Sequence, residues 1–295
     1  MTSVAELRRR GSAMLSDAGC ESGNLDIELL IGRVLGMRRE QVIAYGEREL
    51  TGAEEQQVTE LLLRRVRREP IAYILGEKEF YGRSFFSGPA ALVPRPETEL
   101  LVERALARLK YLPPAEELLL FDVGTGSGII AVTMLLEIKQ RFEFRNVRAI
   151  ASDISAAALE VARANAERHG VSSALELCVT DLLSGLPLHS GTFAMILANL
   201  PYVPSEDTLA PDVALYEPAS ALFGGASGLD VISRLVSQVN AEKPCSRGAL
   251  LLEFGCGQKL ELESMLSRVG LTAEFHLDLQ GIPRVAEVLY REARC

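Results

Sequence analysis

Hydrophobic positions in the first 70 residues recur every three or four residues. In the ranges 4–15 and 58–66 the apolar residues fall on one face of a helix. A hydroxyl residue followed three positions later by glutamate, at 3–6 and at 51–54, fits the capping box that opens a helix. The pattern predicts a small all-helical domain at residues 1–70.

The next segment, residues 71–93, changes character. It contains IAYILGEKEFYGRSFFSG, in which aromatic residues and short apolar runs are separated by glycine. Runs of this kind predict short strands or a hairpin. We interpret the segment as a linker between two domains.

Residues 94–295 alternate between strand-like and helix-like patterns. Strands are expected at 117–123, 148–153, 174–180, 193–199, 248–254, 272–277 and 285–291, and helices from Pro96 and at 127–140, 155–169, 228–240 and 257–269. Alternation at this spacing is typical of a doubly wound, mostly parallel seven-stranded sheet with helices on both faces, and the last two strands can form an antiparallel edge. An α/β domain of this Rossmann-like type binds its ligand beyond the carboxyl ends of the strands.

Composition agrees with an ordinary two-domain globular protein. Apolar residues make up 48% of the 295 and charged residues 24%. No apolar run reaches the length that spans a bilayer, and the start, MTSVAELRRR, lacks the apolar core of a signal peptide. We therefore expect a cytoplasmic protein without membrane contact, and a monomer by default.

The net charge and the spacing of cysteine and histidine limit the possible classes of function. The net charge of −9 disfavours stable binding of nucleic acid. Arginines nevertheless gather at 8–10 and 64–68, as either a solvated helix face or a docking surface for a ribonucleoprotein or acidic partner. The scattered cysteines and histidines have no metal-ligand spacing, so no metal is expected. These residues are Cys20, Cys178, Cys245, Cys256, Cys295, His169, His189 and His276.

The first strand of the sheet runs into the turn Asp122-Val-Gly-Thr-Gly-Ser-Gly128 and then into a helix. Glycines allow a tight turn and the close approach of a ligand to the helix N-terminus. The spacing is not the G-x-G-x-x-G of dinucleotide binders, and an acidic residue before the first glycine is typical of S-adenosylmethionine sites. Cofactor-binding residues are expected here: Asp122, Gly124, Thr125, Gly126, Ser127 and Gly128.

Acidic residues also follow the next two strands. Asp153 ends the second strand, where a carboxylate can accept both ribose hydroxyls of a nucleoside, although it could instead cap the following helix. Asp181 and Leu182 follow the third strand, at a position suited to the adenine ring. Together with the glycine turn, these residues favour a bound nucleoside.

The fourth strand leads into Asn199-Leu200-Pro201-Tyr202. The nitrogen of an amide or aromatic amine is a poor nucleophile because its lone pair is delocalised. An asparagine oxygen and the next backbone carbonyl can accept both N–H groups of an NH₂, while the tyrosine packs on the planar group. We expect Asn199 to Tyr202 to be the catalytic and substrate-binding loop, with Asn199 also bordering the cofactor.

Several segments together resemble the release-factor glutamine methyltransferases, the HemK family. They are Glu69-Pro-Ile-Ala-Tyr-Ile-Leu-Gly76, Val93-Pro-Arg-Pro-Glu-Thr-Glu99, the turn 122–128, the loop 199–202, Tyr216-Glu-Pro218, Gly224-Gly225 and Gly228-Leu229. The resemblance covers nearly the whole chain, and the proline-rich segment is more specific than the glycine turn.

The resemblance implies a class I methyltransferase domain that uses S-adenosyl-L-methionine. Its substrate would be the glutamine of the Gly-Gly-Gln tip of class 1 peptide chain release factors, which the helical domain helps to recognise. Arg95, Glu97 and Glu217 would then line the substrate cleft, although Glu97 also suits a helix start. Leu200 departs from the family's Asn-Pro-Pro-Tyr loop, which restores an N–H and frees φ.

Two alternatives remain open from the sequence. Asn-Leu-Pro-Tyr also resembles the loop of ribosomal-RNA adenine dimethyltransferases, so methylation of adenine in RNA or DNA is the first. The second is a non-catalytic nucleoside-binding or assembly protein whose loop lost activity when Leu200 appeared.

Overall fold

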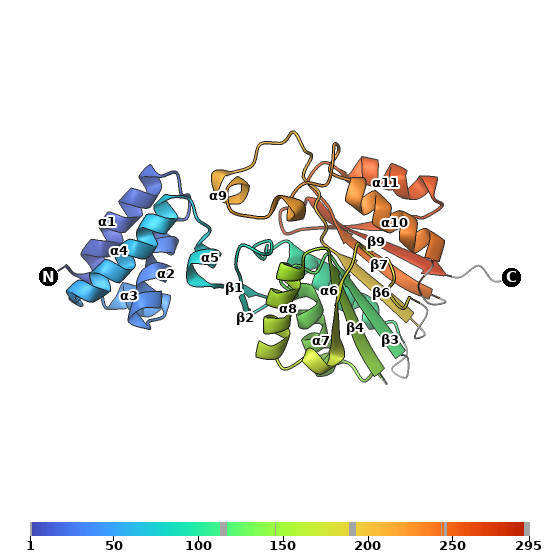
Figure 1. Cartoon of the computed structure of the whole chain (residues 1–295), viewed down its shortest axis with the longest axis horizontal. Coiled ribbons are helices and arrows are strands. Elements are labelled where there is room, and N and C mark those ends of the chain that lie inside the picture. Colours follow the sequence, from blue (N-terminus) through green and yellow to red (C-terminus); the bar gives the residue numbers. More distant parts are fainter. Residues whose placement is uncertain are drawn as a thin grey trace. The chain divides into compact units, whose positions relative to one another are not determined.

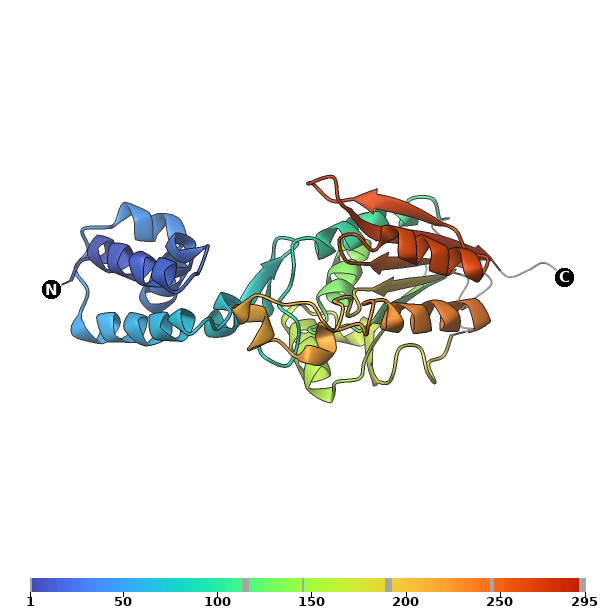
Figure 2. The same cartoon turned by 90° about the horizontal axis from the view of Figure 1, so that it is seen from above.

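The computed structural model describes residues 2–112, 117–144, 146–188, 193–242, 244 and 247–291. His189, Cys245 and Cys295 lie outside these residues. The chain divides into two compact units (Figures 1 and 2). The helical unit is Met1–Glu77 with Leu209–Tyr216, and the α/β unit is Lys78–Thr208 with Glu217–Cys295.

The helical unit confirms the helical pattern predicted for the start of the chain. Its helices are α1 (Val4–Asp17), α2 (Gly23–Leu35), α3 (Arg39–Ala44), α4 (Gly52–Val66), α5 (Ile71–Leu75) and α9 (Pro211–Ala214). Ser3 and Thr51 are the N-caps of α1 and α4, and each hydroxyl accepts the backbone N–H three residues later. Only the second cap forms the complete capping box, in which the Glu54 carboxylate accepts the N–H of Thr51.

The apolar faces of these helices form one core. Leu7, Leu15, Ile27, Leu30 and Leu62 are fully or almost fully buried in it. This is where the apolar positions at helical spacing are expected to lie, because burying that face is what stabilises short helices.

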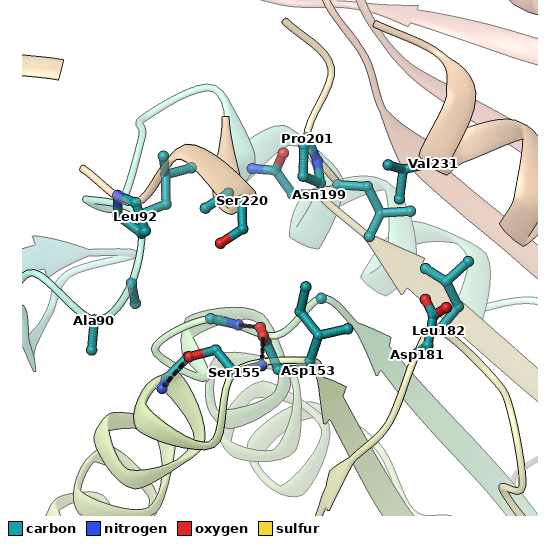
Figure 3. Close-up of a pocket in the computed structure, with 18 of the residues that line it drawn as sticks. Ala90, Leu92, Asp153, Ser155, Asp181, Leu182, Asn199, Pro201, Ser220 and Val231 are labelled. Atoms are coloured by element: carbon teal, nitrogen blue, oxygen red, sulfur yellow. Dashed lines mark hydrogen bonds between the residues drawn. The ribbon is translucent and has the colours of Figure 1, made fainter. Parts of the chain in front are cut away.

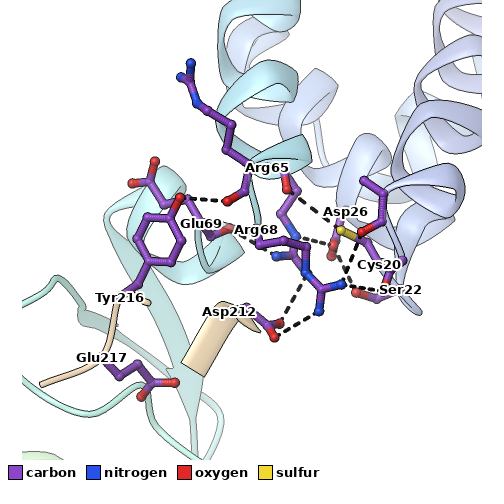
Figure 4. Close-up of polar contacts among 12 residues, drawn as sticks. Cys20, Ser22, Asp26, Arg65, Arg68, Glu69, Asp212, Tyr216 and Glu217 are labelled. Carbon is purple, nitrogen blue, oxygen red and sulfur yellow. Dashed lines mark hydrogen bonds and ion pairs between the residues drawn. The ribbon is translucent and has the colours of Figure 1, made fainter. Parts of the chain in front are cut away.

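A buried ion pair crosses this core. Arg65 Nε lies 2.8 Å from Asp26 Oδ2, and only 6% and 1% of the two side chains are exposed. The Ser22 hydroxyl donates a second hydrogen bond to Asp26, and Arg65 also donates to the Glu69 carbonyl (Figure 4). The charge is therefore matched and hydrogen-bonded within the unit.

Segment Leu209–Tyr216 belongs to the helical unit although its chain neighbours on both sides belong to the α/β unit. Asp212 of this segment lies 3.0 Å from Arg68 and 3.7 Å from Arg65 (Figure 4). The Tyr216 hydroxyl donates to the Arg67 carbonyl at 2.7 Å. Nothing in the sequence pattern predicts this placement.

These contacts bear on the arginine clusters. Most of the clustered arginines pair with acidic residues of their own unit: Arg8 with Glu28, Arg10 with Glu55, Arg64 with Glu69, Arg65 with Asp26 and Arg68 with Asp212. The pairing favours a structural interpretation of the clusters over a docking surface.

The α/β unit contains the predicted seven-stranded sheet. Its strands are β3 (Glu117–Val123), β4 (Asn146–Asp153), β5 (Leu175–Val179), β6 (Phe193–Ala198), β7 (Arg247–Glu253), β8 (Ala273–Leu277) and β9 (Pro283–Arg291). The order is β5-β4-β3-β6-β7-β9-β8, parallel as far as β7, with β9 antiparallel to both β7 and β8. The parallel sheet and the antiparallel edge are both confirmed.

Helices cover both faces of the sheet (Figure 1). They are α6 (Thr98–Leu109), α7 (Ile129–Arg141), α8 (Ala156–Arg168), α10 (Asp230–Glu242) and α11 (Lys259–Arg268). Leu118 and Leu120 of β3 share a core with α6 and α7, whereas Leu119 and Phe121 share one with α10 and α11. Successive side chains of a strand point to opposite faces, so an unbroken apolar strand serves both cores.

Short elements complete the described chain. They are the hairpin strands β1 (Glu77–Phe80) and β2 (Arg83–Phe86) and the 3₁₀ turns Ser172–Ala174 and Ala219–Ala221. The hairpin lies within the predicted linker. Among the described residues, no helix has the length and apolar character needed to cross a membrane.

Candidate functional site

The α/β unit holds a cavity at the carboxyl ends of its parallel strands (Figure 3). Eight of the residues predicted for the site line it: Gly124, Gly126, Asp153, Asp181, Leu182, Asn199, Leu200 and Pro201. They come from the end of β4 and from the segments that follow β3, β5 and β6. The topology brings these ends to one edge, as expected for a sheet of this type.

The glycine turn owes its shape to Asp122. This side chain is fully buried and does not line the cavity. Its Oδ2 accepts the Thr125 hydroxyl at 2.6 Å and the Ala131 N–H at 2.9 Å, which ties the turn to the start of α7. Burial raises the pKa of Asp122 to about 6. In the structure Asp122 organises the turn from behind.

The turn leaves room for a ligand. Gly124 and Gly126 have φ of +71° and +56°, a region that favours glycine, and both line the cavity. Thr125 and Ser127 are buried, and neither they nor Gly128 line it. A Cβ on Gly124 would lie 2.7 Å from Leu200 Cδ2, so the leucine of the catalytic loop packs on the turn.

Asp153 faces the cavity with its carboxylate held by backbone donors (Figure 3). Oδ2 accepts the Gly126 N–H at 2.9 Å, and Oδ1 accepts the Ser155 N–H at 2.8 Å. The cap of α8 is instead the Ser155 hydroxyl, which accepts the Ala158 N–H. Each Asp153 oxygen keeps a second lone pair that could accept a ribose hydroxyl.

Asp181 and Leu182 form a further wall of the cavity. Leu182 has φ of +55° and is buried, and its carbonyl accepts the Ser152 hydroxyl at 2.9 Å. Asp181 pairs with Arg234, which also lines the cavity. These residues combine an apolar surface with a charged rim.

The loop Asn199 to Tyr202 is held from several directions. The Asn199 Nδ2 donates to the Thr98 hydroxyl at 2.9 Å. The Gln258 Nε2 donates to the Tyr202 carbonyl at 2.8 Å. A Cβ on Gly228 would lie 2.1 Å from that carbonyl oxygen, so glycine is needed where this turn meets the loop. The loop is therefore held by side chains and a turn from other segments, although Leu200 stands where the resemblance implies proline.

Tyr202 lies behind the cavity wall and does not line the cavity. Its hydroxyl is 3.5 Å from Glu253 Oε1, at the end of β7. Burial, followed by the charge of Glu253, raises the pKa of Tyr202 to about 12, so the phenol stays neutral. Burial also raises the pKa of Glu253 to about 7. Glu253 is not among the residues predicted from the sequence, although an acidic residue at the end of the apolar run GALLLE points to such a position.

The three residues expected to line a substrate cleft lie elsewhere in the α/β unit. Arg95 pairs with Glu217, whose other oxygen accepts the Val93 N–H at 2.9 Å, so this pair ties two loops together. Glu97 is the N-cap residue of α6 and borders a separate hollow together with Glu99 and Asp278. None of the three lines the cavity. Their roles in substrate binding stay predictions.

Other residues that line the cavity were not predicted. Ala90, Ala91 and Leu92 come from the linker, and Ser155, Ser220 and Arg234 come from two helices and a turn. Residue type alone carries no signal for such positions, because they become neighbours only through the tertiary fold.

Sheet order and cavity define a Rossmann-like methyltransferase. A family model described as a methyltransferase domain matches residues 120–213. The catalytic domain of hMettl16, solved in complex with MAT2A 3′UTR hairpin 6, has a TM-score of 0.53 at 13% identity, over 83% of this chain and 84% of that one. At this identity the likeness shows the fold.

Sequence relatives are more specific. The model of the PrmC N-terminal domain matches residues 6–76. Release factor glutamine methyltransferases match at 36% identity in Bradyrhizobium diazoefficiens, over 96% of this chain and 93% of that one, and at 40% in Koribacter versatilis, over 92% of each. The chain belongs to the release factor glutamine methyltransferase family.

Proposed function

We propose that the chain methylates the side-chain amide nitrogen of the glutamine in the Gly-Gly-Gln motif of class 1 peptide chain release factors, in the cytoplasm where these factors act. The observation that carries the proposal is the placement of Asn199. Its Nδ2 is engaged by Thr98, and the residue lines the same cavity as the glycine turn and Asp153.

The cavity fits the nucleoside part of S-adenosylmethionine. The turn at Gly126 presents no side chain, and Asp153 presents a carboxylate already oriented by two N–H groups. When bound, this cofactor supplies an electrophilic methyl group. Arg234 and Asp181 close the side of the cavity with a paired charge, and Leu182 offers an apolar surface for a base.

Asn199 and the Leu200 carbonyl would orient the substrate amide. Both can accept an N–H, which fixes the NH₂ group and directs its lone pair toward the methyl group. Bound S-adenosylmethionine would supply the methyl group to this nitrogen, and the extra proton on nitrogen would then pass to water. No strong base is required, because an alkylated amide that carries the extra proton is very acidic.

Methyl incorporation from labelled S-adenosylmethionine tests the proposal. The acceptors are a purified bacterial class 1 release factor, the same factor with its Gly-Gly-Gln glutamine changed to alanine, and ribosomal RNA. Label is expected in the intact factor alone. Label in RNA would assign the chain to adenine methylation instead, and cofactor binding without any transfer would indicate a non-catalytic protein.

An Asn199→Ala variant tests the assignment of the loop. Loss of a preorganised polar group at the reacting centre lowers kcat by about 100- to 1,000-fold. Asn240→Ala, in α10 and outside the cavity lining, is the matched control and should keep wild-type kcat. Equal kcat in the two variants would show that Asn199 has no catalytic role.

A further inference from the structure

Buried carboxylates distinguish one part of the α/β unit. Among the described residues, most buried carboxylates pair with an arginine: Asp26 with Arg65, Glu28 with Arg39, Glu137 with Arg83, Glu217 with Arg95 and Glu287 with Arg108. Asp122 and Glu253 have no such partner. Asp122 is explained by its hydrogen bonds to the glycine turn, whereas Glu253 has no backbone donor in the described structure.

Glu253 instead lies at the end of a chain of polar side chains. Its side chain is 1% exposed, and its Oε2 has no hydrogen-bond partner among the described residues. The nearby Thr98 side chain acts to lower the pKa of Glu253, which favours the ionised carboxylate. Thr98 is equally buried, and its oxygen accepts the Asn199 Nδ2 at 2.9 Å.

The direction of these hydrogen bonds matters. A hydroxyl that accepts from an amide N–H has its single proton free to donate elsewhere, and an ionised carboxylate can only accept. The Thr98 proton is therefore available to the neighbouring Glu253 carboxylate while the Thr98 oxygen accepts from Asn199. With the amide in the opposite orientation, the Asn199 NH₂ would face the cavity, where it would repel the NH₂ of a substrate amide.

We propose that Thr98 and Glu253 are positioning residues that fix the orientation of the Asn199 amide, so that its oxygen faces the substrate. This inference rests on the proposed function, because it assigns Asn199 the task of accepting an amide N–H. It also gives a role to the threonine of the segment Val93-Pro-Arg-Pro-Glu-Thr-Glu99, which the sequence pattern alone does not explain.

We call the proposed chain from Asn199 through Thr98 to Glu253 the relay. Isosteric changes at Thr98 test it. Thr98→Val keeps the shape but removes the hydroxyl, so kcat should fall by about 10- to 100-fold, the equivalent of a lost buried hydrogen bond at the reacting centre. Thr98→Ser restores the hydroxyl and should stay within about 3-fold of wild type. The KM for the release factor should change by less than about 2-fold, because the relay orients the reacting group and adds no binding surface.

Thr133 offers the matched control. It is a fully buried threonine of α7 whose hydroxyl has no hydrogen-bond partner among the described residues. Thr133→Val should leave kcat unchanged. The dissociation constant for S-adenosylmethionine, measured by calorimetry, should match wild type in all three variants, which shows that the fold and the cofactor site are intact.

A pH profile separates orientation from simple packing. Glu253 is faced by the carboxylate of Glu97, the guanidinium of Arg284 and the phenol of Tyr202. As pH falls through about 7, Glu253 gains a proton and can donate to Thr98. The Thr98 hydroxyl is then no longer required to donate to Glu253 and accept from Asn199, so the Asn199 amide is held less firmly in one orientation. Wild-type kcat should fall below that pH, and Glu253→Gln and Thr98→Val should lack this step.

A signal that needs no turnover keeps the two proposals separate. In protein labelled with ¹⁵N at asparagine side chains, the Asn199 NH₂ signal is assigned by its absence from Asn199→Asp. Its protons should exchange slowly in wild type and in Thr98→Ser, and faster in Thr98→Val. Equal exchange in all three proteins, or wild-type kcat in Thr98→Val, would overturn the relay. Wild-type protein that labels no release factor would overturn only the proposed function.

Discussion

In the helical unit the buried carboxylate of Asp26 lies against Arg65, whereas in the α/β unit Asp122 and Glu253 are buried without a cation. The difference is local, because Glu287 of the same sheet pairs with Arg108. Asp122 lies behind the glycine turn and Glu253 behind the Asn199 loop. Desolvation raises the pKa of both, and nothing in the described structure offsets it with an ion pair.

The comparison separates two uses of buried charge. A matched pair in a helical core fixes how helices meet, and removing one partner is costly because the other remains buried and charged. An unpaired carboxylate near a cavity destabilises the fold. Because it can only accept hydrogen bonds, it also fixes which neighbouring groups must donate. Groups of this second kind gather at functional sites.

Breaking the matched pair should have the largest effect. Arg65→Met leaves Asp26 charged and buried, so the free energy of unfolding should fall by about 3–5 kcal/mol. Urea unfolding followed by circular dichroism measures the change. Arg33→Met, at an exposed arginine of α2, should change it by less than about 0.5 kcal/mol. If the double variant Asp26→Leu/Arg65→Met is no more stable than Arg65→Met, unpaired charge is not the cause.

Neutralising the unpaired carboxylate of Glu253 should raise the free energy of unfolding instead of lowering it. The folded pKa of Glu253, about 7, exceeds the ordinary glutamate value of 4.5, so the folded state binds the extra proton and wild-type stability falls as pH rises between these values. Glu253→Gln lacks this loss and should be more stable than wild type by about 2 kcal/mol at pH 8, with the gain gone near pH 4.

Glu287→Gln is the control for that change. It removes a carboxylate that pairs with Arg108 and His276, so it should destabilise the protein at pH 8. Thermal unfolding of both variants at pH 8 and pH 5 compares them directly. A loss of stability in Glu253→Gln at pH 8 would show that Glu253 is matched after all.

The sequence predicted most elements of the fold because each depends on local periodicity. Strand 117–123 was predicted with its observed bounds, and the seven strands and their antiparallel edge followed from the spacing of apolar runs. Several cavity-lining positions could also be predicted from the sequence, since Asp153, Leu182 and Asn199 stand at or just after strand ends. Features of this kind can be predicted because they depend on the local sequence pattern alone.

Contacts between distant residues could not be predicted. Thr98 and Asn199 are 101 positions apart, and nothing in either sequence neighbourhood identifies the other. The same holds for Asp212 and Arg68, 144 positions apart. Asp122 was expected at the ligand, but the hydroxyl three residues later and the N–H of α7 draw it inward. Roles of this kind are set by the tertiary fold.

Gln258 offers a smaller test of the support behind the catalytic loop. Its Oε1 accepts the Gly255 N–H at 2.7 Å, and its Nε2 donates to the carbonyls of Tyr202 and Ser227. Gln258→Leu removes all three hydrogen bonds and should lower kcat about 10-fold while S-adenosylmethionine still binds. Gln238→Leu is the control, because this glutamine contacts Leu183 and Ser184 away from the loop. Equal kcat values would show that the loop needs no such support.

The smallest effect is expected where paired charge is partly exposed. Asp212 holds segment Leu209–Tyr216 to Arg65 and Arg68, with 28% of its side chain exposed. Asp212→Asn should therefore cost no more than about 1 kcal/mol of global stability.

That change should nevertheless be visible locally. The N–H groups of Val213, Ala214 and Leu215 donate within the segment, so their hydrogen exchange reports its opening. Exchange should be up to about 5-fold faster in Asp212→Asn, and the difference should shrink in high salt because screening already weakens the wild-type pairs. Asp207→Asn, at an exposed residue just before the segment, should exchange like wild type. Unchanged exchange in Asp212→Asn would mean that the Tyr216 hydrogen bond and local packing hold the segment without the ion pairs.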